Sequence, residues 1–298
     1  MRSFPPKEVR HQLFGSVPSS LGTKPCQKED MTDIQKTEQD FYFHLEEVGI
    51  CRMSYPVHIV SKTAPQHQTT AAEFTLSTSL ASHQKGIHMS RLSEQLHMYY
   101  ESSKPLDVNT LKELTAELAR QMNQSTASVH VSFPWYMEKQ SPVTGKSGLM
   151  HATIKYDVHF HEKDGWTCHV GCDAQVTTLC PCSKEISEYG AHNQRGSVSI
   201  QVKLFEQAPL PDDMKTSLLQ IIESNASAPL YPVLKRPDEK KVTEEAYENP
   251  RFVEDVTRLI AIELYEQPWI QGFQVECRNE ESIHQHDAYA KCSYEKNL

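Results

Sequence analysis

The sequence predicts an α+β fold in which the order strands, two helices, strands occurs twice. Three observations support this prediction. The chain has 298 residues, which is enough for one large domain or two of ordinary size. Apolar residues alternate, as in strands, near both ends of each half, and they follow helical spacing in the middle of each half. We find no repeat at the level of sequence, so the duplication lies in the plan alone.

In the first half, residues 1–38 are polar and rich in Pro, Ser, Gly and Lys, which predicts an arm outside the core. Strands are expected at 41–45, 55–60 and 70–76, followed by two helices. Ser90 is expected to cap the first helix. The second helix and the strand after it are predicted by buried apolar stripes: Leu111, Leu114, Leu118 and Met122 for the helix, and Val129, Val131 and Phe133 for the strand.

The turn-like segment Thr144–Gly148 is our predicted boundary, which divides the rest of the chain into modules 39–148 and 149–298. The second module begins with strands at 152–160 and 166–178, joined by a turn at 163–165. A third strand, a helix, a second helix and two closing strands follow. Asn249 and Pro250 are expected to open that second helix. The residues that carry these predictions are Val198, Ile200, Val202 and Leu204; Met214, Leu218, Ile221 and Ile222; Val253, Val256, Ile260 and Leu264; Phe273, Val275 and Cys277; and 288–294.

Composition narrows the class of protein. The net charge of −9 argues against a protein that coats nucleic acid, and no apolar run approaches the ~20 residues of a membrane span. The N-terminus lacks the apolar stretch of a signal peptide. Eight cysteines at irregular spacing do not form a disulfide framework. We therefore expect a cytoplasmic protein with neither nucleic-acid nor membrane partners.

The segment Thr177–Gly196 concentrates thiols, acids, cations and a histidine within twenty residues. In an extended chain Cys180 and Cys182 would point the same way, with His192 twelve residues beyond Cys180. Thiolate and imidazole together suit a borderline metal such as zinc, and a free thiol beside a metal is a candidate nucleophile or acid. The alternative is that these cysteines are small buried hydrophobes, like most cysteines of cytosolic enzymes.

Two further segments could complete a metal site. His284 and His286 are also two residues apart, so an extended segment could aim both at one cavity. The charged run at 234–249 contains Glu239, an acid that could join a Cys/His/Glu/His set. The alternatives are two solvated loop histidines and an ordinary solvated charged face.

Glu254 is a candidate for binding a planar ligand. It lies near the start of a predicted helix, where a carboxylate is favoured by the helix dipole. A carboxylate can accept two parallel hydrogen bonds, and guanine offers two adjacent donors at N1 and the 2-amino group. An ordinary N-terminal helix acid is the alternative.

Five cations are candidates for a triphosphate pocket. Lys85, His88 and Arg91 lie at a predicted helix start, where free backbone N–H groups bind phosphate. Lys184 and Arg195 would add charge from the cysteine segment. Each of these residues alone could equally be surface charge.

Taken together, these residues resemble the prokaryotic type IB GTP cyclohydrolase I family. The resemblance rests on long runs that occur in the family's order between residues 85 and 288: His88–Arg91, Cys180–Ser187, Ala191–Arg195, Leu234–Glu239, Tyr247–Asp255 and Glu280–Ala288. The segments 15–17, 22–25 and 31–33 are similar to the family's N-terminal region.

The resemblance implies a tunnelling fold, with two modules of antiparallel sheet that each carry a helix pair on one face, in a homotetramer with sites at subunit interfaces. It implies conversion of GTP and water to 7,8-dihydroneopterin triphosphate and formate, the first step toward tetrahydrofolate. One divalent metal (zinc, manganese or iron) would be held in each site. The implied ligands are Cys180, His192, Glu239 and His284.

The resemblance also implies roles for other residues. Cys182 would contact substrate, and Glu254 would anchor guanine. Proton transfers could involve Cys182, His286 or Glu281. Two alternatives stay open on the sequence: a tunnelling-fold nitrile reductase that uses a cysteine nucleophile and NADPH, and a non-catalytic metal-binding module.

Overall fold

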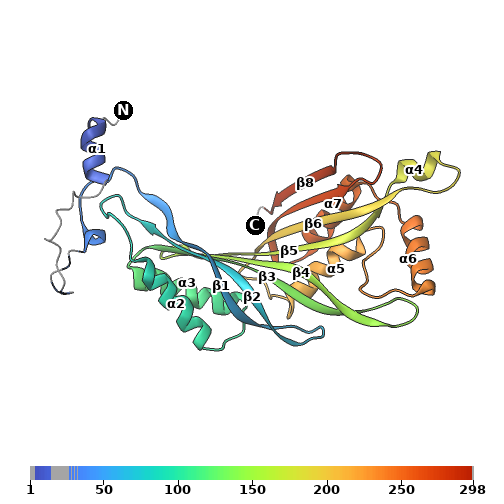
Figure 1. The fold of residues 1–298 in the computed structure, drawn as a ribbon, viewed down its shortest axis with the longest axis horizontal. Helices are drawn as coiled ribbons and strands as arrows, with labels where there is room; N and C mark the ends of the chain where they lie inside the picture. The colour runs from blue at the N-terminus through green and yellow to red at the C-terminus, as the bar shows by residue number, and fades with distance from the viewer. Residues whose placement is uncertain (1–3, 15–26, 28, 30, 32, 297–298) are drawn as a thin grey trace.

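Eight antiparallel strands form one sheet in which the spatial order of the strands is their order along the chain. The computed structural model describes residues 4–14, 27, 29, 31 and 33–296. Figure 1 shows the strands as long, twisted ribbons. Their bounds are β1 (Leu45–Val60), β2 (His67–Leu80), β3 (Thr126–Gln140), β4 (Ser147–His161), β5 (Gly165–Leu179), β6 (Asn193–Leu204), β7 (Ile270–Glu280) and β8 (Ala288–Glu295).

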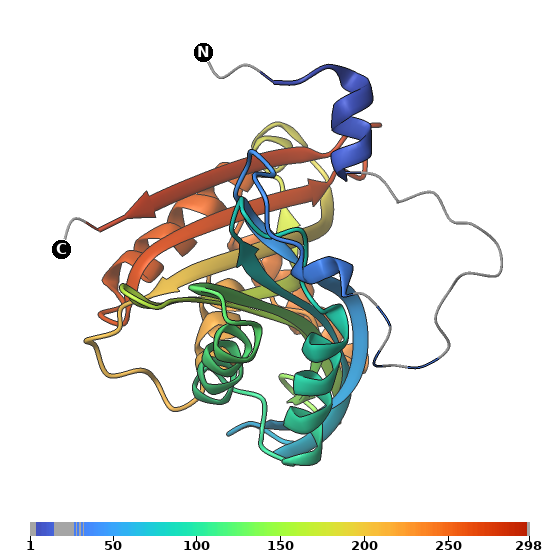
Figure 2. The same ribbon diagram turned by 90° about the vertical axis from the view of Figure 1, so that its left-hand side faces the viewer.

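The helices occupy the connections between strands. Two lie between β2 and β3, and three lie between β6 and β7. Those that pack on the sheet lie on the same side of it (Figure 2), whereas α1 projects from the opposite end of the molecule from α4 (Figure 1). The bounds are α1 (Lys7–Phe14), η2 (Ile34–Lys36), α2 (Met89–Glu101), α3 (Val108–Met122), α4 (Pro181–Ile186), α5 (Met214–Ser224), α6 (Arg236–Glu248) and α7 (Val253–Glu266).

One face of the sheet carries the core, because alternate residues of each strand align across it. Val131 on β3 faces Tyr156 on β4, which faces Val170 on β5, which faces Val202 on β6, and all four are buried. The predicted stripe of α3 is also buried on this face, as are the predicted apolar residues of α5 and α7: Leu111, Leu114, Leu118, Met122, Leu218, Ile221, Ile222, Val253, Val256, Ile260 and Leu264. A single core therefore runs under both halves.

The sheet separates between β4 and β5 at one end. Pairing of these strands stops at Thr153 and Asp173, whereas β3 and β4 stay paired to Ser147 and β5 and β6 stay paired to Leu179. Beyond the separation the free edge of β5 is bonded to another segment, through the Thr177 N–H and the Ala228 carbonyl at 3.0 Å. The plan of two strands, helices and two strands begins again at β5. The predicted module boundary, which falls at the start of β4, stays a prediction.

A buried polar network joins the two halves where β1 ends. The carboxylate of Asp213, just before α5, accepts hydrogen bonds from the Ser61 hydroxyl at 2.7 Å and the Lys62 backbone N–H at 2.9 Å. Its other oxygen lies 2.9 Å from the Lys215 ammonium, which also donates to the Val60 carbonyl at 3.1 Å. Burial alone would raise the pKa of Asp213, but these donors lower it to about 2.

Two local predictions for the second half were wrong. The helix expected to open at Asn249 and Pro250 begins instead at Val253, and Phe252 is its N-cap residue. The Asp255 carboxylate accepts a hydrogen bond from the Phe252 N–H at 3.0 Å. Asn249 closes the preceding helix α6, to which its N–H is bonded through the Glu245 carbonyl. The charged run at 234–249, in which no helix was predicted, contains this helix, and most of the helix is exposed.

Two local predictions for the first half were also wrong. The expected strand at 41–45 forms only from Leu45 onward, because Tyr42 has a φ of 73°, which no strand allows. The N-cap residue of α2 is His88, not Ser90. The family-like segments 15–17 and 22–25 lie outside the described residues. Within the described part of the chain, none of the helices has both the length and the apolarity needed to cross a membrane.

Candidate active site

The cysteine segment forms a corner at the end of β5. Cys180 caps the short helix α4, and its Sγ accepts a hydrogen bond from the Ser183 N–H at 3.4 Å. Cys182 lies in the first turn of that helix and is exposed. The extended geometry expected for Cys180 and Cys182 is therefore wrong, and the two thiols do not point the same way. This difference separates them into one thiol at the cavity described below and one at the surface.

A backbone hydrogen bond joins His192 to Cys180. The Cys180 N–H donates to the His192 carbonyl at 3.1 Å, directly before β6 begins. The His192 Nδ1 lies 3.0 Å from the Gln194 Oε1 and 3.8 Å from the Glu281 Oε2. The side chains of His192 and Glu281 are each only 12% exposed. The ends of β5 and β7 and the start of β6 thus meet here, where the backbone of Cys180 is bonded to that of His192 and the His192 imidazole lies near the Glu281 carboxylate.

A cavity of about 240 Å³ opens beside this corner. Cys180 and Glu281 line it together with the start of α7, which contributes Glu254. The Glu254 side chain is exposed and has no hydrogen bond or ion pair within the described part of the chain. The other lining residues are Gln194, Arg251, Phe252, Val253, Asn279, Ala288 and Tyr289. The fold therefore leaves an unpaired carboxylate and a thiol in the lining of one cavity.

The remaining predicted metal ligands lie outside this cavity. His284 and His286 are exposed in the loop before β8, where their rings stack with centroids 5.1 Å apart. Glu239 is exposed in the first turn of α6. Among the described residues, no three His, Cys, Asp or Glu side chains are grouped so that they could hold an ion. Cys180 and His192 supply a sulfur and a nitrogen donor, which fit a borderline divalent metal. Completing the set requires the exposed segments to rearrange.

Of the five residues predicted to bind phosphate, Lys85 donates to the Leu13 carbonyl at 3.4 Å, and the other four are likewise engaged outside the Cys180 cavity. Lys184 donates to the Tyr247 carbonyl and lies 4.3 Å from the centroid of that ring. His88 Nε2 lies 3.2 Å from Asp33 Oδ2, and the exposed Arg91 donates to the Gln121 carbonyl at 3.4 Å.

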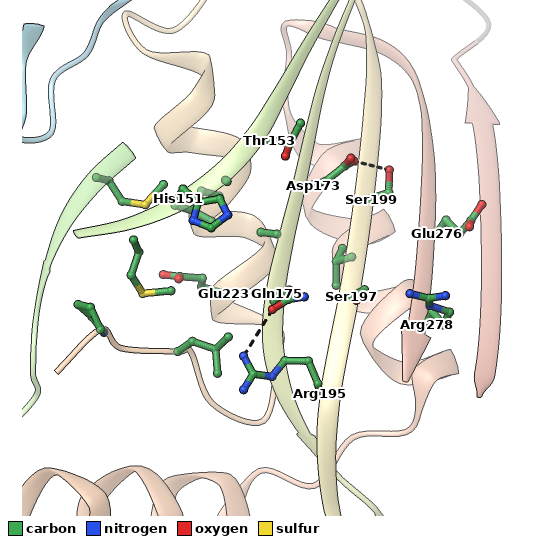
Figure 3. A pocket seen from close by; sticks show the side chains of 18 of the residues that line it. His151, Thr153, Asp173, Gln175, Arg195, Ser197, Ser199, Glu223, Glu276 and Arg278 are labelled. Carbon is green, nitrogen blue, oxygen red and sulfur yellow. Dashed lines mark hydrogen bonds between the residues drawn. The ribbon is translucent and has the colours of Figure 1, made fainter. Parts of the chain in front are cut away.

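Arg195, the last of these residues, points into a different cavity of about 720 Å³, where β4 and β5 separate (Figure 3). Its Nη1 lies 3.5 Å from the Gln175 Oε1, and Figure 3 shows both side chains between the separated strands. Asp173 and Ser199 form a hydrogen bond of 2.6 Å farther along the same cavity. In a single chain Arg195 is therefore directed away from Cys180.

Comparison with known proteins was made at two levels, sequence and fold. A family model described as type I GTP cyclohydrolase folE2 matches residues 31–290. The chain belongs to this family. It is 56% identical over 292 residues to the GTP cyclohydrolase FolE2 of Bacillus licheniformis, covering 98% of this chain and 97% of that one. It is 53% identical over 294 residues to the protein of the same name from Bacillus subtilis, covering 99% and 97%.

A solved structure described as uricase from Arthrobacter globiformis shares the fold. It matches with a TM-score of 0.55 at 7% identity, covering 85% of this chain and 94% of that one. The α+β tunnelling fold expected from the sequence is confirmed. Membership of the FolE2 family also confirms the resemblance and does not favour the nitrile reductase or the non-catalytic module.

The Cys180 cavity contains two residues for which the sequence predicted no role. Arg251 precedes α7 and lines the same cavity as Glu254, and the buried Asn279 on β7 lines it as well. A signal for Arg251 was present, since it is a cation directly after Pro250 in a family-like run. Asn279 gave no such signal, because only the pairing of β6 with β7 brings it to the site.

Proposed function

We propose that this chain converts GTP and water to 7,8-dihydroneopterin triphosphate and formate, as a GTP cyclohydrolase at the start of tetrahydrofolate synthesis. The observation that carries the proposal is its identity of 56% over 98% of its length to a protein named GTP cyclohydrolase FolE2. The cavity supports it, because the Cys180 thiol and the free carboxylate of Glu254, at the start of α7, both line it. Purified protein should release formate from GTP and yield a product that becomes fluorescent on oxidation. A preparation that holds metal and binds GTP but releases no formate would contradict the proposal.

Glu254 binds the Watson–Crick edge of guanine in this scheme. Its carboxylate accepts from N1–H and from the 2-amino group, a pair of donors that adenine lacks. The carboxylate has no competing partner among the described residues, so no existing interaction has to break first. A site of this kind rejects the wrong base because its carboxylate, once covered by the bound base, would be left unpaired.

We expect Glu254→Gln to weaken GTP binding by roughly ten- to a hundredfold, since it replaces two charge-assisted hydrogen bonds by one neutral bond. Metal content should stay at the level of the parent. Glu266→Gln is the matched control, because that residue ends the same helix and is exposed outside the cavity. Equal GTP affinity in the parent and the Glu254 variant would contradict this role.

Cys180 and His192, with Glu239 and His284, would hold one divalent metal, which would supply Lewis-acid activation of the water that hydrolyses the purine. Which metal is bound depends on which metals are available in the cell, since a mixed S/N/O donor set accepts zinc, manganese or iron. Gln194 holds the His192 imidazole in one orientation, since its Oε1 lies 3.0 Å from Nδ1, and the Glu281 carboxylate lies 3.8 Å from the same nitrogen. Glu281, Cys182 and His286 are the residues proposed to move protons during ring opening and loss of formate.

A homotetramer with sites at subunit interfaces accounts for the positions of the remaining cations. His88 and Arg91 belong to the first half and the Cys180 cavity to the second, so a neighbouring copy would bring them together with Lys184 and Arg195 around the triphosphate. The outer edges of β1 and β8 pair with no further strand among the described residues, and closing such edges is a common reason for ring assembly.

Subunit mixing tests this arrangement. We expect Arg91→Ala and Cys180→Ala proteins, each inactive alone, to regain part of the activity after their subunits exchange, because some interfaces then pair an intact Arg91 with an intact Cys180. Formate release from the mixture is the measurement. Mixed oligomers that form, as shown by tagged subunits, and recover no activity would contradict a shared site.

A further inference from the structure

Arg251 lines the cavity that contains Cys180 and Glu254, and it also lines a neighbouring cavity of about 250 Å³ formed by residues of α5 and α6. Its backbone N–H bonds the Leu179 carbonyl at 3.0 Å, which fixes it beside the end of β5. One guanidinium nitrogen, Nη1, donates to the carbonyl of Pro250 at 3.0 Å. The Nε is buried and has no hydrogen-bond partner within the described part of the chain. No acid among the described residues lies within ion-pair distance of this guanidinium.

Such a group is costly in the absence of ligand. A buried N–H donor without a partner destabilises the fold, and native proteins leave few donors in that state. Glu254 and Glu281 line the same cavity, yet neither is paired with Arg251. The wall therefore holds a cationic donor and two acceptors that are separately available, which suits a ligand carrying both an acceptor and donors.

We propose that Arg251 donates a hydrogen bond to the O6 carbonyl oxygen of guanine and, with Glu254, sets the base specificity of the site. This inference rests on the proposed function. O6 lies next to N1 on the Watson–Crick edge, so a carboxylate at N1–H and the 2-amino group leaves O6 as the neighbouring acceptor. Glu254 follows Arg251 by three residues at the start of α7, and both side chains reach one cavity.

The charge of the cavity argues against the triphosphate as the group that Arg251 binds. Arg251 is the one cationic side chain among the described residues that line the cavity, and two carboxylates accompany it. A triphosphate carries several negative charges and would be repelled by the two carboxylates. A neutral base with one carbonyl acceptor meets no such penalty. Guanine thus matches both signs of charge in the cavity.

Three nucleotides separate these possibilities. GTP carries O6, N1–H and the 2-amino group; ITP keeps O6 and N1–H; and 2-aminopurine riboside triphosphate keeps the 2-amino group but lacks both O6 and the N1–H donor. Affinities are to be measured on the full-length protein by competition with a ribose-labelled fluorescent GTP, within seconds of mixing. We expect Arg251→Met to weaken GTP and ITP by the same factor, roughly ten- to a hundredfold, and to leave the 2-aminopurine nucleotide unchanged.

Two variants serve as controls. Arg258→Met removes an exposed arginine of the same helix outside the cavity and should change none of the three affinities. Arg251→Lys keeps a donor and the charge, so it should show a smaller loss with the same dependence on O6, and it replaces Arg251→Met if that variant does not fold. Equal weakening of all three nucleotides, or no weakening of any, would overturn the proposal.

Failure of this proposal is distinguishable from failure of the proposed function. A parent protein that turns over GTP while the Arg251 variants bind every nucleotide as the parent does refutes the role of Arg251 alone. A parent that neither binds nor turns over GTP refutes the function, and the role of Arg251 with it.

Discussion

Replacing Cys180 by alanine is expected to remove the divalent metal and reduce GTP turnover to background. Cys180 lines the cavity, and its backbone is bonded to that of His192, the second proposed metal ligand. The variant therefore loses the sulfur ligand of the proposed metal site. Water activation is lost together with the metal. Elemental analysis after dialysis and release of formate are the two measurements.

The matched control is Cys182→Ala, since the second thiol lies two residues away but is exposed in the first turn of α4. We expect this variant to keep its metal and to lose turnover, because the resemblance assigns Cys182 to substrate contact. Equal loss of metal from both variants would show that the two thiols share one role. The geometry favours separate roles, since a helical turn points residues two apart in different directions.

The largest expected effect on stability comes from Asp213→Asn. The substitution leaves the Lys215 ammonium, whose side chain is only 9% exposed, without its negative partner. Removing one member of a buried ion pair typically lowers the free energy of unfolding by about 3–5 kcal/mol. Chemical denaturation followed by circular dichroism measures this change. Asp212→Asn is the control, because that neighbouring carboxylate is 77% exposed and its pair with Lys62 should contribute only about 0–1 kcal/mol.

The same carboxylate makes stability depend on acid. The pKa of Asp213 in the fold is about 2, below the ordinary value of about 3.9 in an unfolded chain. A lowered pKa in the folded state means that the stabilisation is complete above pH ~5 and is lost progressively as the pH falls to ~1. The parent should therefore lose roughly 2.5 kcal/mol over this interval that Asp213→Asn does not lose. Identical acid profiles for the two proteins would contradict this account.

The elements that could be predicted from sequence are those whose residues pack on the common core. The stripe from Leu111 to Met122 and the alternation from Val198 to Leu204 each record burial against one layer, and the structure confirms both. The helix α6 was missed because its core contribution is small; Asp238 and Ala246 are its buried residues. Asp238 holds α6 to the turn after β3 by accepting from the backbone N–H groups of Val143 and Thr144. Such a contact between distant segments leaves no periodic trace in the sequence.

The predictability of the site follows the same division. The density of chemical groups between Thr177 and Gly196 indicated Cys180 and His192, and the backbone places these two together. That Glu254 lies across a cavity from Cys180 depends on how α7 packs, which no local pattern specifies. Arg251 was missed for that reason. Only after the fold brings it to the cavity does the absence of a partner for its Nε, among the described residues, become visible.

The sequential order of the strands has a consequence for how the chain is made. Every strand of the sheet pairs with the strand synthesised just before it, so none has to insert between two strands that are already joined. Growth of the sheet can therefore keep pace with a ribosome, and the cost of closing each connection rises only slowly with its length. Four strands and both helices of the first half precede residue 162, whereas Asp213 emerges later. The first half must therefore wait, with Ser61 and Lys62 unbonded to that carboxylate, until the polypeptide has grown well past its midpoint.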